Sequence, residues 1–80
     1  MIELIGAAFR EDGTILTAEV INDTYQVEVQ KDENQLRYKE ARHHGFKSFL
    51  KSFDEITGSK YRDLLDEVCF FMNVDIGTSD

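Results

Sequence analysis

Short turn signals divide residues 2–40 into four segments in which apolar and polar side chains alternate. Asp12-Gly13 and Asn22-Asp23 are typical of two-residue hairpin loops, and residues 31–34 fit a four-residue loop. Because successive side chains of a strand point to opposite faces of a sheet, the choice of loop residues decides which side chains share a face. The sequence therefore predicts four antiparallel strands, over residues 2–10, 14–21, 24–30 and 35–40.

The predicted loops place almost all strongly apolar side chains of the strands on one face of the sheet. The pairs expected on that face are Phe9 with Leu16, Ala7 with Ala18, Ile5 with Val20, Leu16 with Val29, Ala18 with Val27, Val20 with Tyr25, Val29 with Leu36 and Val27 with Tyr38. A register error of one residue would scramble this pattern, so its coherence favours an antiparallel meander. We expect this apolar face to meet the core.

Apolar residues recur at helical spacing in two runs after the predicted strands. The first run predicts a helix over residues 46–57, with an apolar stripe of Phe46, Phe49, Leu50, Phe53 and Ile56. Gly58 stands where a left-handed residue commonly ends a helix, and Ser59 is suited to N-cap a second helix over residues 60–73. The second stripe comprises Tyr61, Leu64, Leu65, Val68, Phe71 and Met72.

Both helical stripes need an apolar surface to pack against, and the sheet offers one. The predicted fold is therefore α+β, a four-stranded antiparallel β-meander with a C-terminal two-helix hairpin packed on one face. Its order along the chain is β-β-β-β-α-α. Residues 1–74 form a single domain in this prediction. Residues 75–80 are expected to be a frayed C-terminal tail because they lack periodicity.

Composition restricts the cellular setting of the chain. No stretch approaches the roughly 18 consecutive apolar residues of a transmembrane span, and the N-terminus lacks the basic segment of a signal peptide. Cys69 is the one cysteine and cannot form an internal disulfide, which fits a reducing compartment. We therefore expect a cytoplasmic protein that does not associate with a membrane.

Catalytic and metal-binding patterns are weak throughout the chain. His43 and His44 are adjacent, so they lack the i, i+4 spacing of a helical metal pair. Arg42-His43-His44-Gly45 could attract an anion, but no nucleotide-binding spacing is present and a polar connecting loop explains the segment better. Cys69 lies beside predicted core positions and is expected to be a buried apolar side chain. We expect no enzyme, no cofactor and no bound metal.

Two surfaces are candidates for contact with another molecule. The first is an apolar patch on the face of the first hairpin that should meet water, formed by Ile2, Leu4, Ala8, Ile15 and Ile21, with Leu4 expected opposite Ile21. Such a patch suits another protein or a second copy of the chain, unless the tail covers it through Val74 and Ile76. The second is an acidic strip on the helices, formed by Asp54, Glu55, Asp63, Asp66 and Glu67. Ion pairs with Lys51, Lys60 and Arg62 are the alternative role for these carboxylates.

Charge indicates the kind of partner. The net charge is −7, which favours a basic protein over nucleic acid or an anionic membrane surface. We therefore expect a non-catalytic protein-binding module, most concretely a small acidic inhibitor of a larger basic or nucleic-acid-binding protein. Small proteins of phages and mobile elements, antitoxins and immunity proteins are analogous in size and charge alone.

Two alternative functions remain open from the sequence. A nucleic-acid-binding module would use the basic segment formed by Arg37, Lys39, Arg42, Lys47 and Lys51, which contains Glu40 as its one acidic residue. The net charge opposes this alternative, and so does Tyr38, because it is expected to point into the core and could not stack on a base. A homodimeric assembly factor would instead use the apolar patch of the first hairpin.

Overall fold

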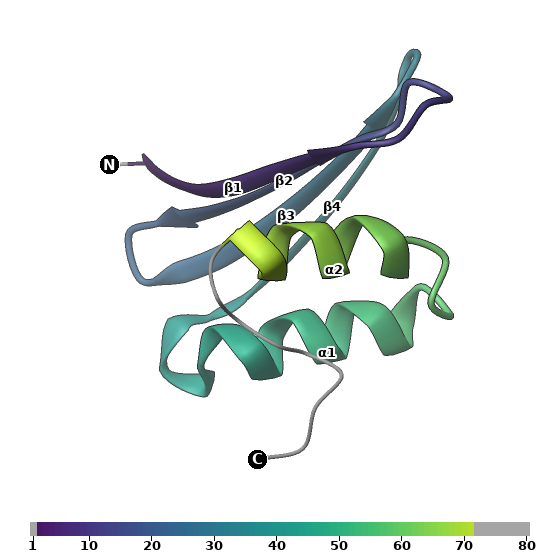
Figure 1. Ribbon diagram of the computed structural model, residues 1–80. Coiled ribbons are helices and arrows are strands. Elements are labelled where there is room, and N and C mark those ends of the chain that lie inside the picture. Colours follow the sequence, from purple (N-terminus) through teal and green to yellow (C-terminus); the bar gives the residue numbers. More distant parts are fainter. Residues whose placement is uncertain (1, 72–80) are drawn as a thin grey trace.

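The computed structural model describes residues 2–71 and confirms the predicted α+β fold (Figure 1). Four strands form one antiparallel sheet in the order β1-β2-β3-β4. Their bounds are Ile2–Phe9 for β1, Ile15–Ile21 for β2, Thr24–Lys31 for β3 and Asn34–Ala41 for β4. A 3₁₀ turn, Arg42–His44, leads into α1 (Phe46–Ile56), and α2 (Arg62–Phe71) follows. The predicted tail, together with Met72, Val74 and Ile76, lies outside the described residues.

Both helices cover the same face of the sheet, which we call the inner face; the opposite side is the outer face (Figure 1). α2 packs over β1 and β2. α1 packs over the other two strands, because Tyr25 of β3 and Tyr38 of β4 contact the ring of Phe49 at centroid distances of 5.6 and 5.5 Å. Neither helix, within the residues described, is long and apolar enough to cross a membrane.

The predicted register of β2, β3 and β4 is confirmed. Leu16 pairs with Val29, and Val27 pairs with both Ala18 and Tyr38. Asn22 has a φ of 57°, the left-handed conformation that a tight two-residue hairpin loop requires. The third loop is shorter than predicted, because Lys31 already pairs with Asn34. The two choices of loop give the same strand pairs, so the faces of β4 are as expected.

The predicted register between β1 and β2 is wrong, by one residue next to the loop and by two residues at the start of β1. The first loop contains three residues, Glu11-Asp12-Gly13, because the amide of Arg10 donates to the carbonyl oxygen of Thr14 at 2.8 Å. Gly13 has a φ of 96°, as expected for the last residue of such a loop. Ala8 therefore lies opposite Leu16 and is fully buried, whereas Phe9 lies opposite Ile15 and is 64% exposed. Phe9 is not a core residue, and Ala8 is not part of an outer patch.

A β-bulge partly restores the expected faces of β1. The register shifts between Leu4 and Gly6, which leaves Ile5 as the extra residue of the strand. Ile5 packs against the core as predicted. Beyond the bulge, Ile2 pairs with Ile21 and Leu4 pairs with Glu19 rather than with Ile21. Both Ile2 and Leu4 therefore stay on the outer face, as the sequence predicted.

One apolar cluster joins the sheet to the helices. Its fully or nearly fully buried members are Ala8, Leu16, Ala18, Val27, Val29, Phe49, Leu50, Phe53, Leu64, Leu65, Val68 and Cys69. Burying a side chain of the size of Leu or Phe stabilises a fold by roughly 1.5–3 kcal/mol. A Cβ added to Gly6 would lie 3.4 Å from Val68 Cγ1, at the short end of ordinary van der Waals contact, so α2 lies close over β1 next to the bulge.

The junction of the two helices follows one sequence signal and departs from another. Gly58 has a φ of 63°, and its amide donates to the backbone carbonyl oxygen of Glu55. The amide of Ser59 donates to the backbone carbonyl oxygen of Asp54, so α1 ends in a Schellman motif. Ser59 does not cap α2, because that helix begins at Arg62. The Ser59 hydroxyl instead lies 3.3 Å from Asp54 Oδ2 and donates to it.

Candidate protein-binding surface

The outer face of the sheet is built from four rows of side chains that run across the strands. From β1 to β4, these rows are Phe9, Ile15, Gln30 and Gln35; Ala7, Thr17, Glu28 and Arg37; Leu4, Glu19, Gln26 and Lys39; and Ile2, Ile21, Thr24 and Ala41. No described element covers these rows, because both helices pack on the inner face (Figure 1). The face is therefore open to another molecule over the described part of the chain.

The half of the outer face formed by β1 and β2 is apolar, and we call it the apolar half. Ile2, Leu4 and Phe9 are 65, 63 and 64% exposed, and Ile15 is also exposed. The two ends of this half carry the large side chains, while the small residues Ala7 and Thr17 lie between them. Glu19 is its one charged residue. The predicted patch residues Ile2, Leu4, Ile15 and Ile21 thus share one surface, and Phe9 replaces Ala8 in it.

The half formed by β3 and β4 is polar, and three of its side chains interact with one another. Arg37 Nη2 lies 2.8 Å from Glu28 Oε2, and Gln35 also donates to this carboxylate. Tyr38 points to the inner face, as predicted, and its hydroxyl donates to Glu40 at 2.8 Å. This hydrogen bond, together with partial burial, raises the pKa of Tyr38. The polar half therefore presents no aromatic ring beside its basic side chains.

The predicted acidic strip does not form one exposed acidic surface. Asp54 is only 7% exposed; its Oδ2 lies 2.9 Å from Arg62 Nη1, and its Oδ1 is buried with no hydrogen-bond partner among the described residues. Arg62 Nε also reaches Asp66 at 3.3 Å. The alternative prediction, that these carboxylates pair within the helical hairpin, is thus confirmed for Arg62. Glu55 and Glu67 are exposed.

Asp63 is paired across the two layers by a residue that the sequence did not point to. Arg10 donates to both of its carboxylate oxygens, at 2.7 and 3.0 Å, and to the carbonyl oxygen of Lys60 at 3.1 Å. These hydrogen bonds lower the pKa of Asp63 and raise that of Arg10. Arg10 and Asp63 are 53 residues apart, so no local pattern links them. Three of the five strip carboxylates therefore have basic partners.

Most of the negative charge of the described chain lies in the sheet and its loops. Residues 46–71 carry five carboxylates and four basic side chains, whereas residues 2–45 carry nine carboxylates and five basic side chains. The loop between β1 and β2 and the loop between β3 and β4 lie together at one end of the sheet (Figure 1). Asp12 and Lys31 connect them through a 3.2 Å ion pair.

The basic segment does not form a single patch. Arg37 and Lys39 lie on the outer face, while Lys47 and Lys51 lie on α1, which covers the inner face. The 3₁₀ turn, Arg42–His44, connects β4 to α1, and the ring centroids of His43 and His44 lie 4.1 Å apart. No group of His, Cys, Asp and Glu side chains within the described residues is arranged to hold a metal ion.

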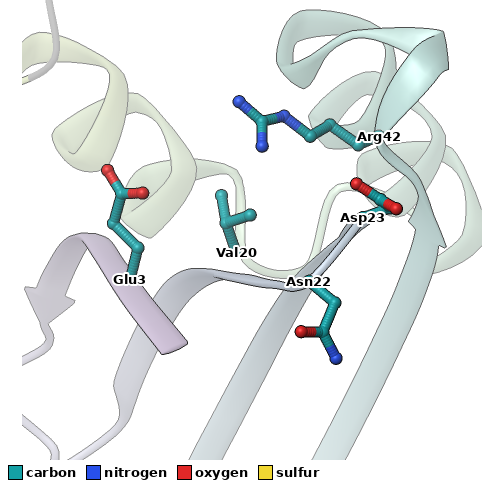
Figure 2. A pocket seen from close by; sticks show the side chains of 5 residues that line it. All are labelled: Glu3, Val20, Asn22, Asp23 and Arg42. Carbon is teal, nitrogen blue, oxygen red and sulfur yellow. The ribbon is translucent and has the colours of Figure 1, made fainter. Parts of the chain in front are cut away.

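A shallow pocket of about 340 Å³ lies beside the β2–β3 loop, at the end of the sheet opposite the β1–β2 and β3–β4 loops (Figure 1). Glu3, Val20, Asn22, Asp23 and Arg42 line it, and Figure 2 shows Glu3 and Arg42 on opposite sides of Val20. Glu3 is on the inner face because it pairs with Val20 beyond the bulge. The Arg42 amide donates to the Asp23 carbonyl oxygen at 2.8 Å. The mixed charges of the rim do not favour one class of ligand.

Comparison with known proteins gives no relative from which a function could be transferred. No protein-family model matches the chain, and no curated protein and no solved structure matches it significantly. The surface of the molecule is therefore the basis on which a function is argued.

Proposed function

We propose that this chain is a non-catalytic protein-binding module, and that it acts as a small acidic inhibitor of a larger basic or nucleic-acid-binding protein. The observation that carries the proposal is the exposed apolar half of the outer face. Ile2, Leu4 and Phe9 each expose nearly two thirds of their surface, on one side of a single hairpin. Large apolar side chains gathered on one exposed surface are typical of protein interaction sites.

The polarity of the outer face also supports contact with a protein. The core of a protein interface is depleted of charge and surrounded by a polar rim. The apolar half carries Glu19 alone, and the polar residues of β3 and β4 border it. Covering each large side chain would contribute up to roughly 1.5–3 kcal/mol before the costs of association.

The charge of the chain supports a basic partner. A net charge of −7 attracts a basic surface over distance and repels a second acidic molecule. Such attraction mainly raises the association rate and weakens as salt increases. The expected partner therefore combines an apolar contact surface with basic surroundings, which fits a protein that also binds nucleic acid.

Affinity capture from a lysate of the source cells, followed by direct binding of the purified captured protein, tests this function. We compare the wild-type chain with Leu4→Glu, which places a charge in the apolar half. Gln30→Glu is the matched control, because it adds the same charge to the polar half of the same face. Circular dichroism verifies that both variants are folded.

The proposal predicts a basic protein that binds the wild type and Gln30→Glu, and that binds Leu4→Glu at least tenfold more weakly. Equal binding to all three forms would show that the contact surface does not include Leu4, and would contradict a contact through the whole apolar half. A dimer in light scattering that Leu4→Glu dissociates, with no captured protein, would instead favour the homodimeric alternative.

A further inference from the structure

The β1–β2 and β3–β4 loops lie together at one end of the sheet, where exposed loop carboxylates accompany an exposed aromatic ring of the outer face (Figure 1). Phe9 and Ile15 form the last apolar pair of the β1–β2 hairpin before its loop. Glu11 lies in that loop, and Asp32 and Glu33 form the loop between β3 and β4. We call these five residues the loop-end surface. The 3.2 Å contact of Lys31 with Asp12 holds the two loops side by side.

The three carboxylates of the loop-end surface differ from those of the helices. Glu11, Asp32 and Glu33 are exposed, and none of them forms an ion pair within the described residues. Asp12 is different, because it accepts hydrogen bonds from Thr14 and pairs with Lys31. Carboxylates without an internal partner keep their full attraction for a basic group of another molecule.

The orientation of Phe9 is a consequence of the three-residue first loop. If the loop contained two residues, the ring would face the helices; instead it is 64% exposed beside Ile15. Aromatic side chains supply much of the binding energy in protein interfaces, because they bury a large apolar area with little loss of conformational freedom. Phe9 is thus suited to enter an apolar depression on a partner.

We infer that the loop-end surface determines which partner the module binds, with Phe9 as the apolar anchor and Glu11, Asp32 and Glu33 as contacts for basic side chains. The occupant is a basic protein surface with an apolar depression, because its charge complements the three carboxylates. A second copy would bring like charges together at this end. This inference rests on the proposed function and specifies the part of the outer face that recognises the partner.

The test uses a short synthetic peptide of alternating lysine and leucine as the probe and NMR shift mapping on the full chain. We expect the largest shift changes at the amides of Phe9, Ile15 and Glu33, with binding that weakens as salt rises toward about 0.15 M. Shift changes centred on Leu4 and Ile21 would overturn the inference while leaving the apolar half as the binding surface. Shift changes centred on α2, or no binding, would overturn it as well.

Charge variants separate specific contact from general attraction. Glu11→Lys combined with Glu33→Lys changes the loop-end surface, and Glu55→Lys combined with Glu67→Lys is the control, with the same change of net charge at exposed positions of the helices. We expect the loop variant to bind the probe about tenfold more weakly than the control. Equal loss in both would mean that net charge alone is responsible, and would overturn the inference.

Replacement of the anchor gives an independent readout. Phe9→Ala is expected to weaken probe binding about tenfold, and Phe9→Trp to retain it, because the larger ring still supplies the apolar contact. Unchanged binding of Phe9→Ala would overturn the role of Phe9. Direct binding of the captured basic protein to the wild-type chain tests the proposed function whatever the probe shows, so failure here is distinguishable from failure of the proposed function.

Discussion

Asp12 organises the first hairpin loop through its own side chain. Its Oδ1 accepts hydrogen bonds from the Thr14 hydroxyl at 2.6 Å and from the Thr14 amide at 3.0 Å, and Lys31 lies 3.2 Å from Oδ2. The two hydrogen bonds from Thr14 are the main reason why the pKa of Asp12 is lowered to about 2. This network explains why the loop closes over three residues rather than two, since it fixes the position of Thr14 opposite Arg10.

The Asp12 network predicts an acid-dependent loss of stability. The folded-state pKa of about 2 lies below the ordinary value of 3.8, so the carboxylate stabilises the fold above pH 4, and this contribution disappears as the pH falls through 2. Urea unfolding between pH 2 and pH 6 measures it, with Asp12→Asn as the comparison. The variant should show a smaller decrease across this range. The same pH dependence in both proteins would contradict the assignment.

At the level of elements, the register of β1 decides which phenylalanine is in the core. Phe49 of α1 is fully buried against Tyr25 and Tyr38, whereas Phe9 of β1 is mostly exposed. Removing a buried ring leaves a cavity, while truncating an exposed ring removes few contacts. The two substitutions therefore measure the register of the first hairpin.

Phe49→Ala should lower the free energy of unfolding by about 3–5 kcal/mol, and Phe9→Ala should change it by less than about 0.5 kcal/mol. Urea titrations followed by circular dichroism give both values. If Phe49→Ala does not fold, Phe9→Ala alone remains decisive. If Phe9→Ala lowered the free energy of unfolding by several kcal/mol, Phe9 would be a core residue and the first loop would have two residues.

The sequence predicted the register of β2, β3 and β4 correctly for two reasons: the Asn22-Asp23 loop has the expected two residues, and loops of two or four residues between β3 and β4 pair the same residues. It predicted the strand β1 but not its register, because Asp12-Gly13 closes a hairpin equally well as a two-residue loop or as the end of a three-residue loop. The run Ala7-Ala8-Phe9 did not distinguish them, since either choice leaves an apolar residue facing the core. Gly6 was the one local sign of the bulge.

For the whole molecule, the single core predicts cooperative unfolding. Tyr25 and Tyr38 of the sheet pack against Phe49 of α1, Tyr61 stacks on Phe53 of the same helix, and there is no tryptophan. Tyrosine fluorescence therefore reports the packing around α1, including its contact with the sheet, while far-ultraviolet circular dichroism reports the helices and strands themselves. We expect coincident urea transitions, with a slope of about 1 kcal/mol per M. Separate transitions would show that the sheet and the helices unfold independently.

The distribution of charge is also a property of the whole molecule, and the sequence predicted it only in part. The exposed apolar patch was recognisable from alternation, since Ile2, Leu4, Ile15 and Ile21 all remain on the outer face. The ion pairing of the acidic strip was not fully recognisable, because the pairing of Asp63 with Arg10 depends on how α2 lies over β1. Helical spacing shows which carboxylates share a face but not which basic side chain a strand brings beside them.

The bulge at Ile5 has a consequence for aggregation. β1 is an edge of the sheet, and Glu3 is its one charged residue, so a regular β1 would be a template for strands of other molecules. A bulge interrupts the row of free backbone groups and increases the local twist, and both effects hinder such pairing. The other edge, β4, is protected differently, by Arg37, Lys39 and Glu40. The irregularity in β1 thus disfavours edge-to-edge pairing between molecules that also expose an apolar face.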